Sequence, residues 1–301
     1  MRLRGAYLAL VLALGEARLL RNAREGSLAK SSRGADPCSP AVGEVERLRA
    51  QGSGRESSSA PRIAHAVYIN LDWDTKRRTF MEQQLRAVSD ANRGAFTFER
   101  LPAVLAHSVE VDERFADFRR RNFSLSSHPV MGTDWRTAAC QYSHESIIER
   151  ISEHAHVLQG NNSVWMILED DSIIPADLEQ RWEKLWPFIP VNWDVIRLGW
   201  FGGGSCNARI NAHVDLALWS DPPPHGPCDY CGTQAYIVNP ARVGRVLTRL
   251  RKSKLYYIDS LLGAAPPPLE KGEWLSVLAT QPPLIRQDES FLSDRVPLVN
   301  S

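Results

Sequence analysis

Residues 164–174 read Val164-Trp165-Met166-Ile167-Leu168-Glu169-Asp170-Asp171-Ser172-Ile173-Ile174, so five apolar residues run directly into three carboxylates. An apolar run of this length is typical of a buried strand in a parallel sheet, whose strands are covered on both faces. Three adjacent carboxylates inside a sheet would be prohibitive, because burial and mutual repulsion both disfavour their charged form. We therefore expect these carboxylates at the carboxyl end of the strand, where open α/β sheets bind their ligands.

Carboxylates gathered at a strand end have two interpretations, and this segment alone leaves both open. Hard oxygen ligands suit Mg²⁺ or Mn²⁺, which makes Asp170 and Asp171 candidate metal ligands. The alternative is a solvated acidic turn that follows an edge strand and binds nothing.

The surrounding sequence predicts the other elements of an α/β domain. Apolar runs predict strands at residues 66–71, 96–101, 193–199 and 233–238. Helical patterns of apolar residues and helix-start signals predict helices over residues 76–88, 137–157 and 239–250. The strand–helix–strand order over residues 66–101 predicts a βαβ unit, which is right-handed and parallel in nearly all cases. We expect residues 62–301 to form a single α/β domain with a mostly parallel sheet flanked by helices.

Length and charge set limits on the class of protein. The 301 residues suffice for one large α/β domain or two small ones. Lys and Arg number 36 against 35 Asp and Glu, which leaves a net charge of +1. This balance gives no sign of nucleic acid or another polyanion as a partner.

The N-terminus predicts targeting to the secretory pathway. Arg2 and Arg4 precede an apolar run over residues 6–15, which fits a secretory signal peptide within residues 1–20. The run is shorter than the roughly 20 residues that span a bilayer, and a signal anchor would have to bury charged residues. An anchor and a chance apolar run remain the alternatives. We expect the protein in the lumen of the endoplasmic reticulum or Golgi, or secreted.

Residues 21–61 are rich in Arg, Ser, Gly, Ala and Glu and contain no aromatic residue. Such a composition cannot bury enough apolar surface to offset the entropy of ordering the chain. We therefore expect a flexible stem between the targeting segment and the folded domain.

The five cysteines are expected to divide into two groups. Cys140 lies on the apolar face of the helix over residues 137–157, so we expect it to be buried and reduced. An oxidising lumen favours disulfides, and we expect Cys206 to pair with Cys228 or Cys231, because their loops are rich in glycine and proline. A zinc site and unpaired thiols are the alternatives, although no second C-x-x-C completes a zinc ribbon.

His144 shares a helix face with Cys140, Ile147 and Ile151, so we expect it to point toward the sheet. One interpretation is a hydrogen-bonded histidine of the core. The other is a functional group near the edge of the sheet that binds the ligand.

Taken in order, these motifs resemble glycosyltransferase family 25, which includes bacterial lipooligosaccharide galactosyltransferases and animal procollagen galactosyltransferases. Seven short segments carry the resemblance: Val67-Tyr68-Ile69-Asn70-Leu71 with Arg77-Arg78, Ala139-Cys140-Gln141-Tyr142-Ser143-His144, Ile167-Leu168-Glu169-Asp170-Asp171, Trp193-Asp194-Val195-Ile196, Gly232-Thr233-Gln234-Ala235-Tyr236-Ile237-Val238, Ile258-Asp259 and Ser293-Asp294. Each segment is short, but seven of them in the right order and at plausible spacing make a specific pattern.

The resemblance implies a GT-A type fold and a metal-dependent hexosyltransferase. The implied reaction moves a hexose, galactose from UDP-galactose above all, to a hydroxyl of a protein or glycan acceptor, with collagen-like proteins among the candidates. The implied metal is Mn²⁺ or Mg²⁺ at Asp170 and Asp171. The residues implied in binding the donor are Asn70, Leu71, Arg77, Arg78, Glu169 and Asp170.

An inverting transfer, which the resemblance implies, needs a general base for the attacking hydroxyl. The candidates are Asp259, His144 and Asp294, whose structural alternatives are a helix N-cap, a core hydrogen bond and a C-terminal turn. Glu169 is a further candidate for the acceptor side. The rival functions are a lumenal binding protein of the same fold without turnover, and a secreted domain that these acids stabilise through calcium.

Entry into the secretory pathway should leave glycans on the sequons at Asn122 or Asn161. We expect protein from a eukaryotic secretory host to lose mass on glycosidase treatment, because N-glycans are attached only in the lumen. Intact-mass spectrometry measures the shift, and a variant with Gln at both positions is the control. An unmodified product that retains residues 1–20 would contradict the signal-peptide prediction.

Overall fold

The computed structural model describes residues 41–51, 59–105, 108, 135–201, 209–217, 230–252, 258–264 and 274–291. The expected targeting segment, residues 1–20, lies outside these ranges, as do Asn122, Cys206, Cys228 and Asp294. Within the described ranges, no helix combines the length and the apolar character that crossing a membrane requires.

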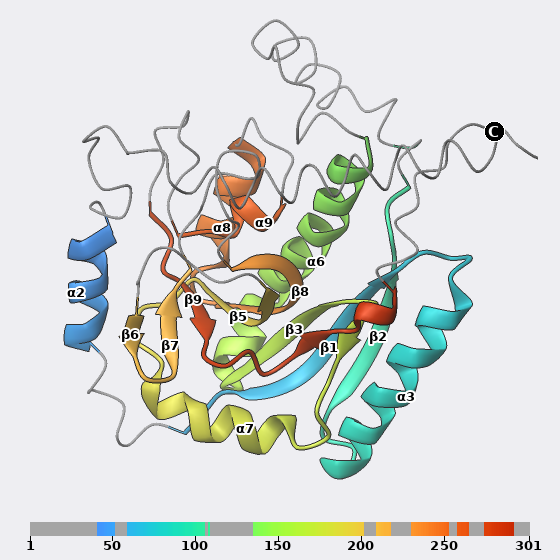
Figure 1. Ribbon diagram of the computed structural model, residues 1–301, viewed down its shortest axis with the longest axis horizontal. Helices are drawn as coiled ribbons and strands as arrows, with labels where there is room; N and C mark the ends of the chain where they lie inside the picture. Colours follow the sequence, from blue (N-terminus) through green and yellow to red (C-terminus); the bar gives the residue numbers. More distant parts are fainter. Residues whose placement is uncertain are drawn as a thin grey trace, which may run out of the picture. The chain divides into compact units, whose positions relative to one another are not determined.

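The main sheet has eight strands and is flanked by helices (Figure 1), which confirms the predicted α/β class. The strands of this sheet are β1 (Arg62–Asn70), β2 (Thr97–Pro102), β3 (Ser163–Glu169), β5 (Val195–Phe201), β6 (Arg209–Asn211), β7 (Val214–Leu216), β8 (Cys231–Val238) and β9 (Val277–Thr280). Their order across the sheet is β2-β1-β3-β8-β5-β9-β7-β6. Among these strands, β7 and β8 run against the other six, so the sheet is mixed but mostly parallel.

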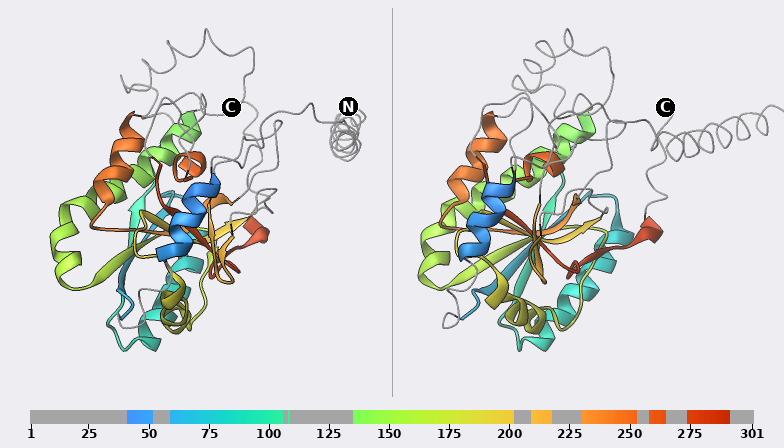
Figure 2. Two further views of the ribbon diagram at one scale, coloured as in Figure 1. Left: turned by 90° about the vertical axis from the view of Figure 1, so that its left-hand side faces the viewer. Right: turned by 60° about the vertical axis from the view of Figure 1, so that its left-hand side comes forward.

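Two connecting helices lie on opposite faces of the sheet. Helix α3 (Thr75–Ala91) follows β1 and precedes β2, and α6 (Trp135–Gly160) lies between β2 and β3 in the chain. Strand β2 lies on one side of β1 and β3 on the other, so the second connection passes back over β1. Right-handed crossovers in opposite directions place their helices on opposite faces, as Figure 2 shows. The reversal creates a topological switch point between β1 and β3, where ligands of such sheets bind.

The predicted helices are present, with shifted ends. The remaining ones are α7 (Leu178–Leu185), the 3-10 turn η2 (Trp186–Phe188), α8 (Val243–Lys252) and α9 (Ile258–Leu261). The helix predicted from residue 239 begins only at Val243, because the Asn239 side chain accepts from the backbone N–H of Ala241 at 3.0 Å and forms a turn. The apolar face of α6 is buried as predicted, with Ile147, Ile148 and Ile151 fully covered.

The prediction of a flexible stem over residues 21–61 is wrong for residues 41–51. Residues Ala41–Gln51 form helix α2, in which Val45 and Leu48 are 6% and 0% exposed. The Arg49 guanidinium donates to the carbonyl of Arg209 in β6 at 2.6 Å. Two apolar residues three positions apart are enough to bury one side of a short helix, whereas composition averaged over forty-one residues hides them.

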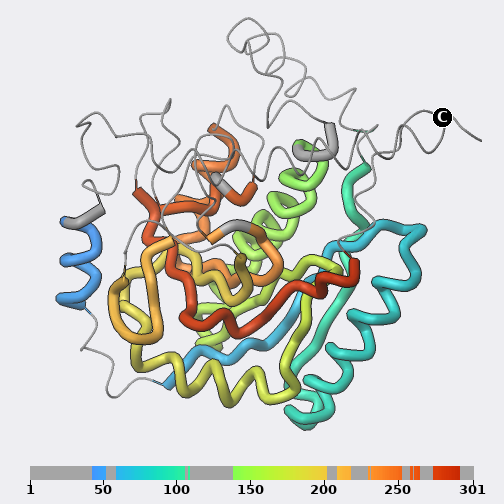
Figure 3. The backbone as a smooth tube through the Cα atoms, in the orientation of Figure 1, coloured from blue at the N-terminus to red at the C-terminus, as the bar shows by residue number. Residues whose placement is uncertain are grey.

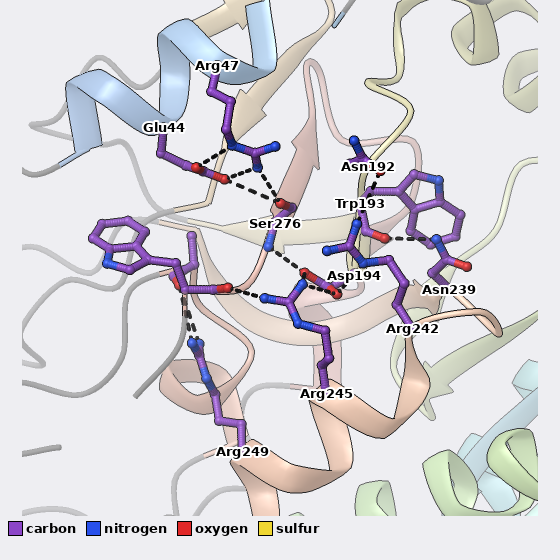
Figure 4. Close-up of polar contacts among 12 residues, drawn as sticks. Glu44, Arg47, Asn192, Trp193, Asp194, Asn239, Arg242, Arg245, Arg249 and Ser276 are labelled. Atoms are coloured by element: carbon purple, nitrogen blue, oxygen red, sulfur yellow. Dashed lines mark hydrogen bonds and ion pairs between the residues drawn. The ribbon is translucent and has the colours of Figure 1, made fainter. Parts of the chain in front are cut away.

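A buried carboxylate joins α8 to the starts of β5 and β9. Asp194 is 0% exposed and accepts from Arg242 Nε at 2.9 Å and from Arg245 Nη1 at 2.8 Å. The backbone N–H of Ser276 also donates to it, at 2.7 Å. Figure 4 shows the network, which reaches α2 through the Arg47 guanidinium, 3.2 Å from the Ser276 hydroxyl.

Replacing Asp194 by Ala should lower the free energy of unfolding by about 3 kcal/mol, because Arg242 and Arg245 lose their shared carboxylate partner. Chemical denaturation monitored by circular dichroism measures the change. The matched control is Asp177→Ala on the exposed i, i+4 pair with Arg181, which should leave the midpoint unchanged. Equal effects of the two substitutions on the free energy of unfolding would show that the Asp194 network stabilises the fold no more than an exposed ion pair does.

Candidate active site

The carboxyl ends of β1 and β3 meet at the switch point, and both end in polar side chains. The two strands are parallel, with Ile69 opposite Glu169, so Asn70 lies beside Asp170. The Asn70 side-chain amide donates to Asp170 Oδ2 at 2.8 Å. The acidic stretch therefore lies at the end of a buried strand, as its sequence predicts.

Arg77 supplies the positive charge beside Asp170. Its Nη1 donates to Asp170 Oδ1 at 2.9 Å, and its Nη2 donates to the carbonyl of Phe291 at 2.9 Å. Arg77 is held there because Asp74 caps α3 by accepting from the Arg77 backbone N–H at 3.0 Å. Burial raises the pKa of Asp170, and the hydrogen bonds from Asn70 and Arg77 oppose that rise. Both oxygens of Asp170 thus have donors within the protein.

Arg78 and Leu71 shape the turn between β1 and α3. The Arg78 guanidinium donates to the carbonyl of Asp72 at 2.7 Å and to Asn70 Oδ1 at 3.4 Å. The carbonyl of Leu71 accepts from the Asp74 backbone N–H at 3.1 Å. The structure thus gathers the predicted donor-binding residues at one end of the sheet, and their contact with a nucleotide stays a prediction.

Asp171 has the feature that fits a cation. Gln287 Nε2 donates to its Oδ2 at 2.8 Å, and Arg77 Nη1 lies 3.8 Å from the same oxygen. The other oxygen, Oδ1, is buried and has no hydrogen-bond partner among the described residues. Burial, followed by the charge of Glu169, raises the pKa of Asp171 to about 6. An unpaired buried carboxylate oxygen is costly, and a divalent cation beside it would relieve that cost.

The segment that supplies Gln287 crosses this end of the sheet. Figure 3 shows the last described residues, in red, running from β9 toward α3. Within this segment, β10 (Arg286–Gln287) pairs antiparallel with β4 (Ser172–Ile173). Strand β4 directly follows the turn formed by Asp170 and Asp171, which we call the acidic turn. The backbone N–H of Asp288 donates to the carbonyl of Asp171 at 2.7 Å. The acidic turn is therefore fixed by strands from both ends of the domain.

Glu169 belongs to a second cluster, on the side of β8. The Thr233 hydroxyl forms a hydrogen bond with Glu169 Oε1 and also lies 3.2 Å from Asp259 Oδ1. The backbone N–H of Gly232 donates to Asp259 Oδ2 at 2.9 Å. A hydroxyl has one proton to donate, so Thr233 can donate to only one of the two carboxylates at a time.

The two carboxylates influence each other's protonation. Burial, followed by the charge of Glu169, raises the pKa of Asp259. Arg197, 2% exposed, opposes this rise and donates to the carbonyl of Asp259. Glu169 and Asp259 therefore form a carboxylate pair that shares the Thr233 hydroxyl. The Asp259 side chain bonds to β8, which differs from the N-cap alternative.

His144 points toward the sheet, as its helix position predicts, and is 1% exposed. Its Nδ1 lies 2.9 Å from the hydroxyl of Tyr236. Its Nε2 lies 3.6 Å from Glu169 Oε1, and it has no hydrogen-bond partner among the described residues. One ring nitrogen thus has a core hydrogen bond, and the other faces the carboxylate pair.

The prediction that Cys140 is buried is wrong, because the residue is exposed. Cys140 lies one turn before His144 in α6, at the end of the helix next to the carboxyl end of β3. The face of α6 that packs on the sheet around Ile147 reaches the candidate site at the N-terminal end of the helix. The predicted pairing of Cys206 falls outside the described residues, and so does the side chain of Cys231.

Sequence reasoning missed three polar groups of the site. Thr233 and Tyr236 lie in a strand predicted to be buried, and the available signal was that buried hydroxyls need hydrogen-bond partners. Gln287 lies beyond the last helix predicted from the sequence, in a segment for which no strand was predicted, and nothing in the local sequence marks it.

Comparison of the chain with models of protein families and with curated proteins gave no match. The resemblance to glycosyltransferase family 25 thus rests on the sequence motifs and stays a prediction. The chemistry available to this site follows from its geometry: a buried carboxylate suited to a cation, and a carboxylate pair suited to accepting a proton.

Replacing Asp171 by Asn should stabilise the protein at pH 7.5 in chelator-treated buffer. The folded state holds the Asp171 proton up to about pH 6, whereas the unfolded chain releases it near pH 4. The folded state binds more protons in this window, so the free energy of unfolding falls as pH rises through it. The variant lacks this loss and keeps the bond from Gln287. We expect a gain of about 1–3 kcal/mol at pH 7.5 and little change at pH 4.

Denaturant titrations at the two pH values measure this gain. Asp177→Asn is the control, because the hydrogen bond from Arg181 lowers the pKa of Asp177 and the substitution should not stabilise the protein. An equal gain from Asp171→Asn at both pH values would rule out the titration of Asp171 as its cause.

Proposed function

We propose that the protein is a metal-dependent glycosyltransferase of the GT-A type. The proposed reaction transfers a hexose, galactose from UDP-galactose above all, to a hydroxyl of a protein or glycan acceptor in the secretory pathway. The observation that carries the proposal is the buried, unpartnered Oδ1 of Asp171 at the switch point of the sheet. The sequence motifs support the choice of a nucleotide sugar as donor.

In this proposal the two aspartates of the acidic turn have different roles: one binds the metal ion and the other positions the turn. Asp171 would hold Mn²⁺ or Mg²⁺, because its Oδ1 is buried without a hydrogen-bond partner among the described residues, and the ion would supply positive charge to offset the negative charge of the departing diphosphate. Both oxygens of Asp170 accept hydrogen bonds, one from Asn70 and one from Arg77, so Asp170 fixes the turn and holds the Arg77 charge next to the turn. Asp170 thus positions the turn, and in this proposal Asp171 is the main ligand of the metal ion.

The carboxylate pair of Glu169 and Asp259 serves as the general base. The acceptor oxygen bonds to the anomeric carbon as the bond from that carbon to the diphosphate breaks, and the acceptor proton passes to the pair. The raised pKa of Asp259 suits this task, since a base is most effective when its pKa approaches the working pH. Thr233 and the backbone N–H of Gly232 hold the pair in place.

His144 supports the same pair. With Nδ1 bonded to Tyr236, the ring is fixed with Nε2 directed at Glu169. A buried imidazole in this position can polarise a substrate hydroxyl or share the proton that Glu169 receives. His144 is therefore assigned to the acceptor side of the reaction.

A second candidate function is a lumenal protein that binds a nucleotide sugar or glycan without turnover. The observation that favours it is the ion pair between Asp170 and Arg77. This pair occupies one of the two predicted metal ligands and leaves the cation with the Asp171 carboxylate alone. Binding without release of UDP would identify this function.

We expect Mn²⁺ and UDP-galactose together to raise the melting temperature and to yield UDP when an acceptor is supplied. Asp171→Asn should abolish the release of UDP, because it removes the cation ligand while keeping the shape of the site. Asp259→Asn should lower kcat about 10²–10⁴-fold, because the pair loses the carboxylate whose raised pKa suits it to accept the proton. A screen of UDP-sugars by thermal shift, followed by a coupled UDP assay with an array of acceptors, measures both effects.

Asp177→Asn on α7 is the activity control and should behave as the wild type. Stabilisation by UDP-galactose and Mn²⁺ without any UDP release across the acceptor array would favour the binding protein. No response to any UDP-sugar would refute the proposed function altogether.

A further inference from the structure

We propose that Cys140, His144 and Glu169 form a binding site for Zn²⁺ that is distinct from the cation site at Asp171. A bound Zn²⁺ would occupy the side chains to which the proposed function assigns proton transfer, so zinc binding and transfer exclude each other. The three residues offer one sulfur, one imidazole nitrogen and one carboxylate oxygen, all within 4.8 Å of one another. This donor set matches three-ligand zinc sites, in which water or substrate takes the fourth position.

The two elements that carry these ligands fix their spacing. Cys140 and His144 lie four positions apart in α6, so their side chains are neighbours on one face of the helix. Glu169 is the last residue of β3, against which α6 packs. Zinc bonds of about 2.0–2.3 Å place tetrahedral ligand atoms roughly 3.3–3.6 Å apart, so the side chains need to close by about an ångström. The Cys140 side chain, which is exposed, has room to make that movement.

The state of the His144 ring supports a metal. The residue is only 1% exposed, and yet its buried Nε2 has no hydrogen-bond partner among the described residues. Its Nδ1 is 2.9 Å from the Tyr236 hydroxyl, so a proton on Nδ1 leaves the Nε2 lone pair facing Glu169. A hydrogen bond on the far nitrogen is the usual support of a metal-ligating histidine.

The chemistry of the ligands separates this site from the acidic turn. Thiolate and imidazole ligands favour Zn²⁺, whereas carboxylate oxygens favour Mg²⁺ or Mn²⁺. Asp171 offers only oxygen, and the Cys140 site offers sulfur and nitrogen as well. The exposure of Cys140 gives the ion a route from solvent.

The test uses the full chain with any native disulfides intact, freed of metal, titrated with Co²⁺ as a spectroscopic substitute and with Zn²⁺ by calorimetry. We expect a thiolate-to-cobalt charge-transfer band that Zn²⁺ abolishes by displacement. Cys140→Ser should remove the band and weaken Zn²⁺ binding at least about tenfold. Tyr236→Phe should keep the band and weaken binding by about 10–100-fold, because it removes the support of His144.

Asp171→Asn is the matched control, and it should keep the charge-transfer band of the wild type, because a carboxylate ligand gives no such band. A charge-transfer band that survives in Cys140→Ser would place the metal on other cysteines and overturn the proposal, as would the absence of a band in the wild type. Loss of the band in Asp171→Asn would also overturn it, since the metal would then belong to the acidic turn. No donor sugar is present in any of these titrations, so their outcome is independent of the transferase assay.

Discussion

Repulsion among three consecutive carboxylates is the constraint that organises this protein. Like charges at adjacent positions disfavour each other's ionised form, most of all when they are partly buried. The fold offsets part of the repulsion by giving each carboxylate partners from different elements: Glu169 bonds to β8, Asp170 to β1 and α3, and Asp171 to β10. Segments from both ends of the domain are thereby held together at one edge of the sheet. The same separation creates two chemical environments, one suited to a cation and one to proton transfer.

Local patterns predicted the parts of the fold and site that depend on neighbours in the sequence. The apolar run that ends at Glu169 forms β3, and the helical spacing around His144 turns that side chain toward the sheet. The βαβ unit over residues 66–101 is present as β1, α3 and β2. These predictions succeeded because strand alternation, helix periodicity and crossover handedness are properties of short stretches of chain.

Contacts between distant segments account for what the sequence did not predict. A strand buried on both faces has the same apolar pattern whether it runs parallel or antiparallel, so the direction of β8 was not predictable from residues 233–238. Gln287 became part of the site through pairing of β10 with β4, more than one hundred positions earlier. The exposure of Cys140 depends on where α6 passes the edge of the sheet, which periodicity alone does not give.

Helix α2 also fixes where the chain enters the domain. It contacts β6 and, through Glu44 and Arg47, reaches Ser276 just before β9. That is the edge where β5 and β9 begin, whereas the acidic turn after Glu169 lies at the edge where β1 and β3 end. The chain therefore enters the described part of the domain at the edge of the sheet opposite the acidic turn, and α2 stabilises the sheet at the edge remote from the three carboxylates.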